Sequence, residues 1–266
     1  MSESVFRVLR VLFLSLLALF LAAPLVVVAG VSFNQGQTMV FPPVGLSLRW
    51  YEEFFTNPSW TASFERSLGI AAATSVLATT IALPVAYVQW KHGSRLARML
   101  GLLGAVPFLL PPVIVSILFV LFWGTLKHVG QIENIVISHT ITFLALPLIL
   151  VSLGFSTVER EMVEAAETMG ARAGDVWHTV VLPIIMPFIV SGMIFTAILS
   201  LNEYIIAYMV AGFTMETLPV KVFSNMRTGF TPAMCVGAVM FLIVGVSGFL
   251  LVARLGNLPK LLGGKA

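Results

Sequence analysis

Charged residues are scarce in this sequence. Only 10% of the 266 residues are Asp, Glu, Lys or Arg, whereas 58% are hydrophobic. A soluble domain carries about 25% charged residues, so this chain has too few charges to cover a water-facing surface. The formal net charge of +3 is small and does not indicate nucleic-acid binding. The composition therefore excludes an ordinary soluble globular protein and predicts a chain whose main solvent is lipid.

Residues for disulfide, metal and nucleotide chemistry are also missing. Cys235 is the single cysteine, so no internal disulfide can form. No Cys/His cluster has metal-ligand spacing. We interpret the four isolated histidines as interfacial or packing residues: His92, His128, His139 and His178. The Gly263-Gly264-Lys265 run lacks the spacing of a phosphate-binding loop. The sequence shows no combination of a nucleophile, a base and a residue that orients the base. We therefore expect no catalytic site, metal or cofactor on this chain.

Apolar segments of the length that crosses a bilayer, about 20 residues, recur along the chain. They cover about residues 11–33, 67–89, 99–123, 134–155, 184–212 and 235–252. The first exceeds the apolar core of a signal peptide, so we interpret it as an uncleaved span, with a signal peptide as the alternative. Pro107, Pro111 and Pro112 predict a kink or break in the third. The fold class predicted is an all-α integral membrane protein with six transmembrane helices.

The basic residues indicate the orientation of these spans. Six spans place both termini on one side, together with the 156–183 loop. Ten of the 15 Lys and Arg residues fall there: Arg7, Arg10, Lys91, Arg95, Arg98, Arg160, Arg172, Arg254, Lys260 and Lys265. The other five are Arg49, Arg66, Lys127, Lys221 and Arg227. The positive-inside rule therefore predicts cytoplasmic termini.

Two segments are expected outside. Segment 34–66 is aromatic, with Trp50, Tyr51, Phe54, Phe55 and Trp60, which we interpret as interfacial anchors, with partner docking as the alternative. Segment 213–234 predicts a short surface helix between Pro219 and Gly229. It is either a connector or a contact surface for an external partner.

The cytoplasmic loop 156–183 is long and acidic. Residues 159–169 are good helix formers, and Gly170 stands where a helix ends on a left-handed residue. Met162, Ala165, Ala166 and Met169 form a narrow apolar stripe at helical spacing. Asp175 is expected to cap a second short helix that stops at Leu182-Pro183. The stripe suits either docking into a separate protein or packing on the chain's own bundle, and spacing alone does not decide between them.

This loop resembles the EAA loop of the permeases of ABC importers. The residues that carry the resemblance are Glu164-Ala165-Ala166, Gly170, Val180 and Leu182-Pro183. Val180 replaces the usual Ile. Arg172-Ala173 stands where relatives often have Ser-Pro, so we expect the second helix to begin later here. The resemblance implies a type I permease fold in which Glu164, Ala165, Ala166, Met169 and Gly170 couple the membrane bundle to a separate ATPase. It implies a permease domain over 63–254, preceded by a first helix and external segment at 1–62 and followed by a cytoplasmic tail at 255–266.

The resemblance extends over about residues 46–253. Leu218-Pro219-Val220 and Gly229-Phe230-Thr231-Pro232 are similar to the polyamine (spermidine/putrescine) branch of the family. It implies a multi-pass protein of the bacterial inner membrane. The expected partners are two ATPase copies that hold ATP and Mg, a second, homologous permease, and an external substrate-binding protein. Other amines and opine-like solutes are the next expected substrates, followed by amino-acid derivatives, sulfate-type anions and iron chelates.

Glu203 is the one carboxylate well inside a predicted span. A charge there costs about 2.5–3.5 kcal/mol on insertion scales, so it should face the bundle interior or water. With Asn202, Tyr204 and Tyr208 it gives a candidate polar face for the translocation path. The alternatives are recognition of a cationic substrate and a structural or gating carboxylate.

Two other classes of protein remain to be weighed. An ion-gradient-driven secondary transporter would use Glu203 as its coupling site, but it leaves the acidic, Ala-rich loop unexplained, and no clear internal repeat is visible. A membrane anchor or scaffold leaves the proline-kinked spans unexplained. We therefore expect an ATP-driven importer permease.

Overall fold

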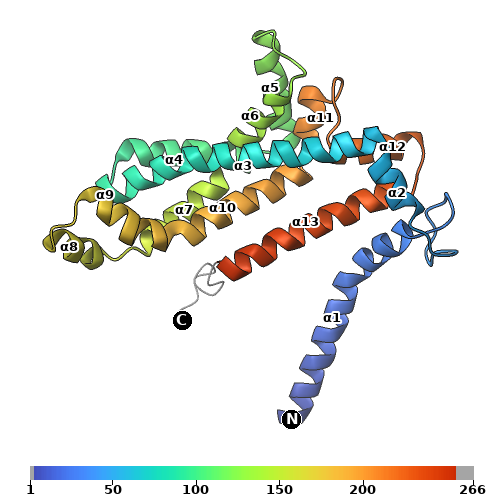
Figure 1. Cartoon of the computed structure of the whole chain (residues 1–266), viewed down its shortest axis with the longest axis horizontal. Coiled ribbons are helices and arrows are strands. Elements are labelled where there is room, and N and C mark those ends of the chain that lie inside the picture. Colours follow the sequence, from blue (N-terminus) through green and yellow to red (C-terminus); the bar gives the residue numbers. More distant parts are fainter. Residues whose placement is uncertain (1–2, 256–266) are drawn as a thin grey trace. The chain divides into compact units, whose positions relative to one another are not determined.

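The computed structural model describes residues 3–255, and helices dominate this range (Figure 1). In chain order they are α1 (Glu3–Ser32), α2 (Arg49–Thr56), α3 (Pro58–His92), α4 (Arg95–Leu109), α5 (Pro112–Thr125), α6 (Ile132–Phe143), α7 (Ala145–Ser156), α8 (Arg160–Thr168), α9 (Ala173–Val176), the π-helix η1 (Trp177–Val181), α10 (Leu182–Asn202), α11 (Ile205–Ala211), α12 (Leu218–Thr228) and α13 (Ala233–Leu255). The tail predicted at 255–266 lies outside the described residues, apart from Leu255. The all-helical fold predicted from the composition is confirmed.

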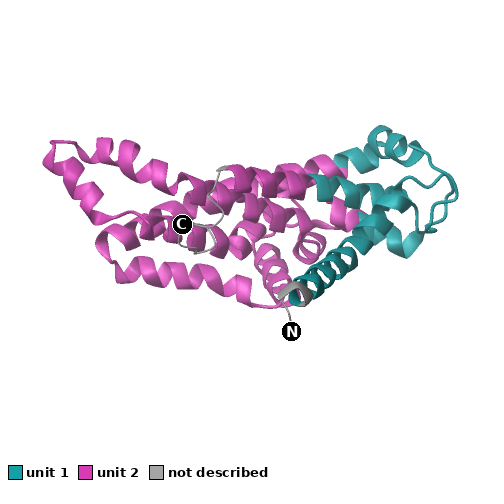
Figure 2. Cartoon of the chain, turned by 90° about the horizontal axis from the view of Figure 1, so that it is seen from below, with its two compact units in different colours: residues 1–62, 222–243 teal, residues 63–221, 244–266 magenta. Residues whose placement is uncertain are grey.

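The chain divides into two compact units (Figure 2). Unit 1 comprises Met1–Ala62 and Val222–Ile243, and unit 2 comprises Ser63–Lys221 and Val244–Ala266. The three-part division at 1–62, 63–254 and 255–266 stays a prediction from the sequence. In the structure, residues 222–243 group with the first 62.

The candidate spans number four to six within the described range. Four helices are long and apolar enough to cross a membrane: Phe6–Ser32, Pro58–His92, Ala173–Asn202 and Ala233–Arg254. The pairs α4/α5 and α6/α7 qualify as bent spans, with bends of 110° and 47°. Counting each pair as one span gives the six that the sequence predicts.

Proline explains both bends. Pro111 and Pro112 separate α4 from α5, and neither has a backbone N–H to continue a helix. Pro147, just after the start of α7, cannot donate to the carbonyl four residues before it. The Pro cluster in the third predicted span therefore makes a break with a turn of more than 90°, and not a mild kink (Figure 1).

In unit 1, Asn34 organises the segment after α1. Its Nδ2 donates to the carbonyl of Thr38 at 2.8 Å, and its own carbonyl accepts the indole N–H of Trp50 at 2.7 Å. Trp50, Phe54 and Trp60 are buried, and the rings of the last two lie 5.7 Å apart. These rings form an internal core instead of the exposed interfacial belt that the sequence suggests. Only Phe55, of the large aromatic side chains on α2, is clearly exposed.

In unit 2, α7 and α10 pack closely because two glycines face the opposite helix. A Cβ at Gly154 would lie 2.9 Å from Phe188, and a Cβ at Gly192 would lie 3.1 Å from Pro147. Small residues allow this close approach between helices in a membrane protein. The α7–α10 pair therefore forms a firm support for the loop that lies between them in sequence.

Candidate functional site

The helix α8 forms where the sequence predicts it, and it ends in a Schellman motif. Gly170 has φ +87°, in the left-handed region. Its N–H donates to the carbonyl of Glu167 at 2.9 Å, and the N–H of Ala171 donates to the carbonyl of Ala166 at 3.1 Å. Open space surrounds Gly170, so its backbone conformation alone calls for glycine. This turn fixes the direction in which the chain leaves α8.

The apolar stripe on α8 divides between two environments. Ala166 is buried and belongs to a cluster with Val151, Phe155 and Val176, and Val163 packs against the same cluster. Met162 and Met169 are 45% and 83% exposed, and Ala165 is exposed as well. Packing on the chain's own bundle therefore holds for part of the stripe, and docking of the remaining part into a separate protein stays a prediction. Val163 and Ala166 anchor α8 to its own bundle, while Met162, Ala165 and Met169 remain available to another protein.

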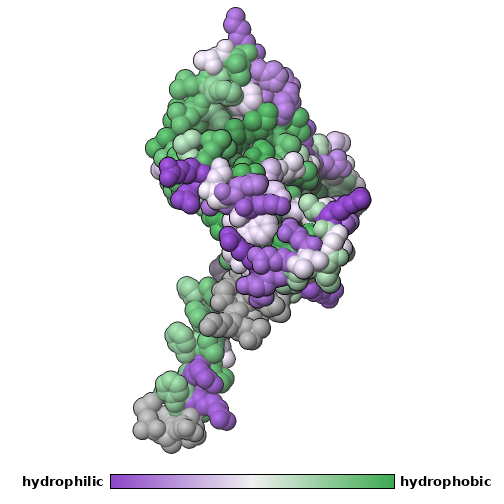
Figure 3. Space-filling model, turned by 90° about the vertical axis from the view of Figure 1, so that its left-hand side faces the viewer, coloured by the Kyte–Doolittle hydropathy of each residue, from purple (hydrophilic) through white to green (hydrophobic). Residues whose placement is uncertain are grey.

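The acidic side chains of the loop lie on the same exposed surface. Glu159, Glu161, Glu164 and Glu167 are all exposed. In Figure 3 the side of the molecule with α8 and α9, on the left in Figure 1, faces the viewer. Hydrophilic side chains gather on this side next to a hydrophobic area. The exposed face of α8 thus combines flexible methionines with carboxylates.

The second helix of the loop differs from the prediction in both its start and its end. It begins at Ala173, earlier than expected, and Asp175 lies inside it, where its Oδ2 accepts the N–H of Arg172 at 3.0 Å. The helix does not stop at Leu182-Pro183. It continues through η1 into α10, so Pro183 lies inside one helical segment, Ala173–Asn202, directly after the π-helical turns. The loop is therefore joined to the fifth span without a break.

Aromatic side chains hold this continuous helix against α3 and α7. Trp177 lies edge-on to Tyr87, with ring centroids 5.3 Å apart, and Trp90 stacks on Phe155 at 5.2 Å. Trp177 belongs to the π-helix η1, an irregularity that often marks a functional site. This aromatic cluster connects η1 to α3 and α7, and the continuous helix connects α9 to α10.

The fifth predicted span, 184–212, is broken at Glu203. Helix α10 ends at Asn202, Glu203 is extended, and α11 begins at Ile205. The carboxylate of Glu203 accepts the N–H groups of Ile206 at 2.8 Å and Ala207 at 3.0 Å. It thereby satisfies two amides that the break would leave unpaired.

The same carboxylate is paired with a histidine. His139 Nε2 lies 3.1 Å from Glu203 Oε2, and His139 Nδ1 lies 2.8 Å from Ser200 Oγ. Both side chains are buried, with 1% of His139 and 8% of Glu203 exposed. His139 is therefore not isolated, contrary to the reading of the sequence. The signal was available, because an ionisable residue inside a span is expected to have a partner on another span.

The other residues predicted for the translocation path occupy different settings. Asn202 is exposed and donates to the carbonyl of Ile198 at 2.8 Å, within its own helix. The rings of Tyr204 and Tyr208 stack with centroids 5.6 Å apart and pack beside Ile135 and Ala207. Glu203 faces the bundle interior, as expected. The assignment of these four residues to a path stays a prediction.

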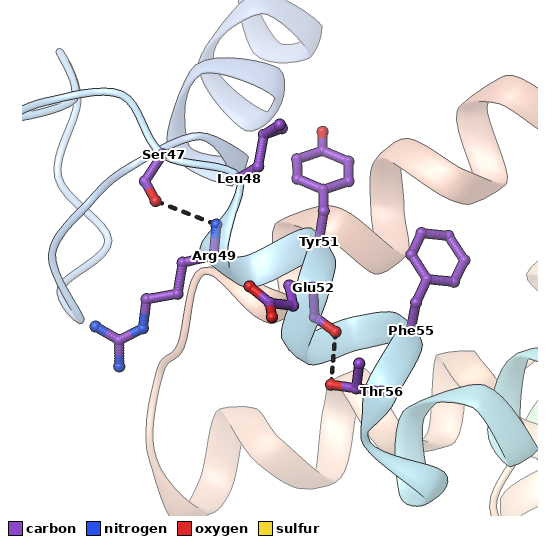
Figure 4. Close-up of a pocket in the computed structure, with 7 residues that line it drawn as sticks. All are labelled: Ser47, Leu48, Arg49, Tyr51, Glu52, Phe55 and Thr56. Carbon is purple, nitrogen blue, oxygen red and sulfur yellow. Dashed lines mark hydrogen bonds between the residues drawn. The ribbon is translucent and has the colours of Figure 1, made fainter.

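A pocket lies along α2 in unit 1. It measures about 550 Å³ and its lining includes Arg49, Tyr51, Glu52 and Phe55. Figure 4 shows Tyr51 and Phe55 extending from one side of α2, one helical turn apart, while Arg49 points away from them. The pocket belongs to the external segment for which partner docking was one of two interpretations, and that interpretation stays a prediction.

Comparison with solved structures defines the class of this fold. A bacterial ABC transporter for import of the acidic polysaccharide alginate matches with a TM-score of 0.66 at 18% identity, over 96% of this chain and 98% of that chain. The MetNI methionine ABC transporter matches with a TM-score of 0.60 at 17% identity, over 73% and 95%. The fold is that of the type I permeases of ABC importers.

The sequence comparisons identify the family. The chain belongs to the family described as the binding-protein-dependent transport system inner membrane component, whose model matches residues 78–258. The putrescine transport system permease protein PotI of Escherichia coli K12 is 30% identical over 91% of this chain and 88% of its own length. The spermidine/putrescine permease protein PotC of Haemophilus influenzae is 26% identical over 90% and 93%. The molybdenum permease protein ModB of Mycobacterium tuberculosis is 29% identical over 82% and 88%.

Membership of this family settles the general function. The chain is a multi-pass permease component of an ABC importer in the inner membrane. It is not an enzyme, because ATP hydrolysis belongs to a separate subunit, and transport by its family depends on a binding protein. The ion-gradient-driven alternative receives no support from these relatives.

Proposed function

We propose that this permease forms the translocation path of an importer for polyamines, spermidine or putrescine, or for a related small amine or opine-like solute. The observation that carries the proposal is the 30% identity to a putrescine permease along nearly the whole chain. The 29% identity to a molybdenum permease makes an oxyanion the competing substrate class. A direct uptake experiment must therefore include both.

The proposed assembly contains this chain, a second and homologous permease, two ATPase copies and an external binding protein. ATP and Mg would be held by the ATPase copies. Both termini and α8 would lie in the cytoplasm, since ten of the 15 basic residues fall on that side of the predicted spans. This orientation would bring the exposed face of α8 to the ATPase.

The coupling role of α8 rests on its two-sided construction. Glu164, Ala165 and Met169 would contact a groove on the ATPase, where methionine adapts to an uneven surface and alanine allows close approach. Ala166 would hold the helix to the bundle, and Gly170 would set the exit angle. Closure of the ATPase would then move α8 together with η1 and α10.

The translocation path would run past the break between α10 and α11. Asn202, Glu203, Tyr204 and Tyr208 supply the polar atoms near this break. In the present structure the carboxylate of Glu203 is satisfied by His139 and by two backbone amides. A cationic substrate would have to compete with those partners for the carboxylate. This competition supports a gating role for Glu203 at least as strongly as direct recognition of the substrate.

Uptake into proteoliposomes tests the function. The chain would be co-purified with its ATPase and second permease, reconstituted, and supplied with the partner binding protein. We expect ATP-dependent uptake of radiolabelled putrescine or spermidine, and no uptake of molybdate. Uptake of molybdate without uptake of polyamines would show that the substrate is an oxyanion, and it would be consistent with the ABC mechanism. Uptake that persists without ATP in the presence of an ion gradient would contradict the mechanism itself.

A further inference from the structure

A small apolar cavity lies between α3 and η1 in unit 2. It measures about 290 Å³ and is lined by Leu83, Pro84, Tyr87 and Trp177. On α3, the neighbouring side chains of Ile81 and Val88 are 45% and 37% exposed, so the cavity opens beside an apolar surface of a membrane-spanning helix. A cavity of this kind is expected to hold hydrocarbon.

A lysine lies beside one of the residues that line the cavity. Lys91 Nζ lies 5.9 Å from the centre of the Tyr87 ring, one helical turn away on α3. Lys91 is exposed, and in residues 3–255 no carboxylate lies within salt-bridge distance of it. Across the same range, the Tyr87 hydroxyl and the Trp177 indole N–H have no hydrogen-bond partner. An ammonium group and two hydrogen-bond donors therefore stand beside an apolar cavity.

We propose that this cavity binds one acyl chain of an anionic phospholipid whose phosphate pairs with Lys91. The arrangement matches the basic sites between transmembrane helices that bind anionic headgroups on the cytoplasmic side. Tyr87 and Trp177 are of the residue types that lie at the headgroup level, with an apolar ring and a polar tip. A cationic substrate does not fit, because Lys91 would repel it and no carboxylate lines the cavity.

The position of the cavity gives the bound lipid a consequence for transport. Trp177 belongs to η1, which joins the loop carrying α8 and α9 to α10. A lipid chain against Trp177 therefore contacts the segment whose movement would accompany ATP hydrolysis. We expect the ATP turnover of the reconstituted importer to rise with the anionic lipid content of the bilayer.

Native mass spectrometry of the intact importer in detergent tests the site. Dioleoyl phosphatidylglycerol and dioleoyl phosphatidylcholine share their acyl chains and differ in headgroup charge. We expect the first molecule of phosphatidylglycerol to bind about fivefold more tightly than phosphatidylcholine, as expected for about 1 kcal/mol from one basic residue near a membrane surface. Lys91→Gln should abolish that preference. Arg254→Gln, a second exposed basic residue on the same predicted side that does not line the cavity, should preserve it.

Leu83→Trp tests the acyl-chain half of the proposal, because the larger side chain fills the cavity and should remove the first binding event for both lipids. Equal preference for phosphatidylglycerol in the wild type and Lys91→Gln would overturn the headgroup assignment, as would displacement of the lipid by millimolar inorganic phosphate. Unchanged lipid binding in Leu83→Trp would overturn the cavity assignment. Should Leu83→Trp fail to assemble, the exposed Lys91→Gln variant still decides the headgroup question. None of these readouts depends on which solute the importer carries.

Discussion

His139 Nε2 and Glu203 Oε2 lie 3.1 Å apart and connect α6 to the break between α10 and α11. Ser200 at the other ring nitrogen fixes the orientation of the imidazole. Removing one member of a buried pair leaves the other polar group unsatisfied, whereas removing both is often nearly neutral. The pair is therefore a suitable subject for a double-mutant cycle.

We expect His139→Leu to destabilise the protein by about 3–5 kcal/mol, because Glu203 would remain buried without its side-chain partner. The double variant His139→Leu/Glu203→Gln should recover a large part of that loss, since no buried carboxylate is left. Thermal unfolding in detergent gives the comparison. A double variant whose loss of stability equals the sum of the losses in His139→Leu and Glu203→Gln would show that the two residues are not energetically coupled.

Glu203→Gln alone separates recognition of a cation from a structural role. The amide oxygen can still accept one backbone N–H of α11, so the break should persist and the variant should assemble normally. If the negative charge attracts a cationic substrate, putrescine uptake should fall at least tenfold, while ATP hydrolysis stimulated by the binding protein changes little. Unchanged uptake would exclude recognition by Glu203 and leave it a capping and gating residue. Asn202→Asp, which adds a carboxylate next to it, is the matched control for charge alone.

The sequence predicted the helical class, the spans, α8 and the turn at Gly170, because each depends on a local pattern. The length of an apolar segment predicts a membrane span, and a run of helix-forming residues followed by glycine predicts a helix that ends in a Schellman motif. The errors came from tertiary context. Pro183 looked like a helix terminator, but it directly follows the π-helix η1, and the helical segment runs unbroken from Ala173 to Asn202. The pairing of His139 with Glu203 joins residues 64 positions apart in the chain, so the need for a partner was predictable but local spacing could not identify His139 as that partner.

The environment of the aromatic residues was misjudged for a similar reason. Trp50 and Trp60 resemble interfacial anchors in the sequence because they follow an apolar span. In the structure Trp50 donates its indole N–H to the carbonyl of Asn34 and is buried. Only the folded path of residues 34–46 brings that carbonyl within reach.

The turn at Gly170 should be needed for coupling. Valine at φ +87° costs about 1–2 kcal/mol through contact between Cβ and the backbone, and β-branching adds to the strain. The segment after α8 should then leave at a different angle. We expect Gly170→Val to insert and assemble, but to lose most of the ATP hydrolysis that the binding protein stimulates.

Gly174→Val is the matched control for Gly170→Val. Gly174 lies four residues further on in α9, outside the left-handed region, with open space around its Cβ position. It should retain stimulated ATP hydrolysis. Equal activity of the two variants would show that the left-handed turn has no part in coupling.

The two adjacent alanines of α8 should respond in opposite ways to the same substitution. Ala165 is exposed, so Ala165→Trp should leave the thermal stability of the permease unchanged but block the close approach of the ATPase. Ala166 is 8% exposed within its hydrophobic cluster, so Ala166→Trp should overpack that cluster and destabilise the permease by about 1–3 kcal/mol. Affinity purification on a tagged permease measures retention of the ATPase, and thermal unfolding of the permease measures stability. Retention of the ATPase by Ala165→Trp at wild-type levels would place the contact on another surface, and loss of stability in that variant would contradict the division of the stripe.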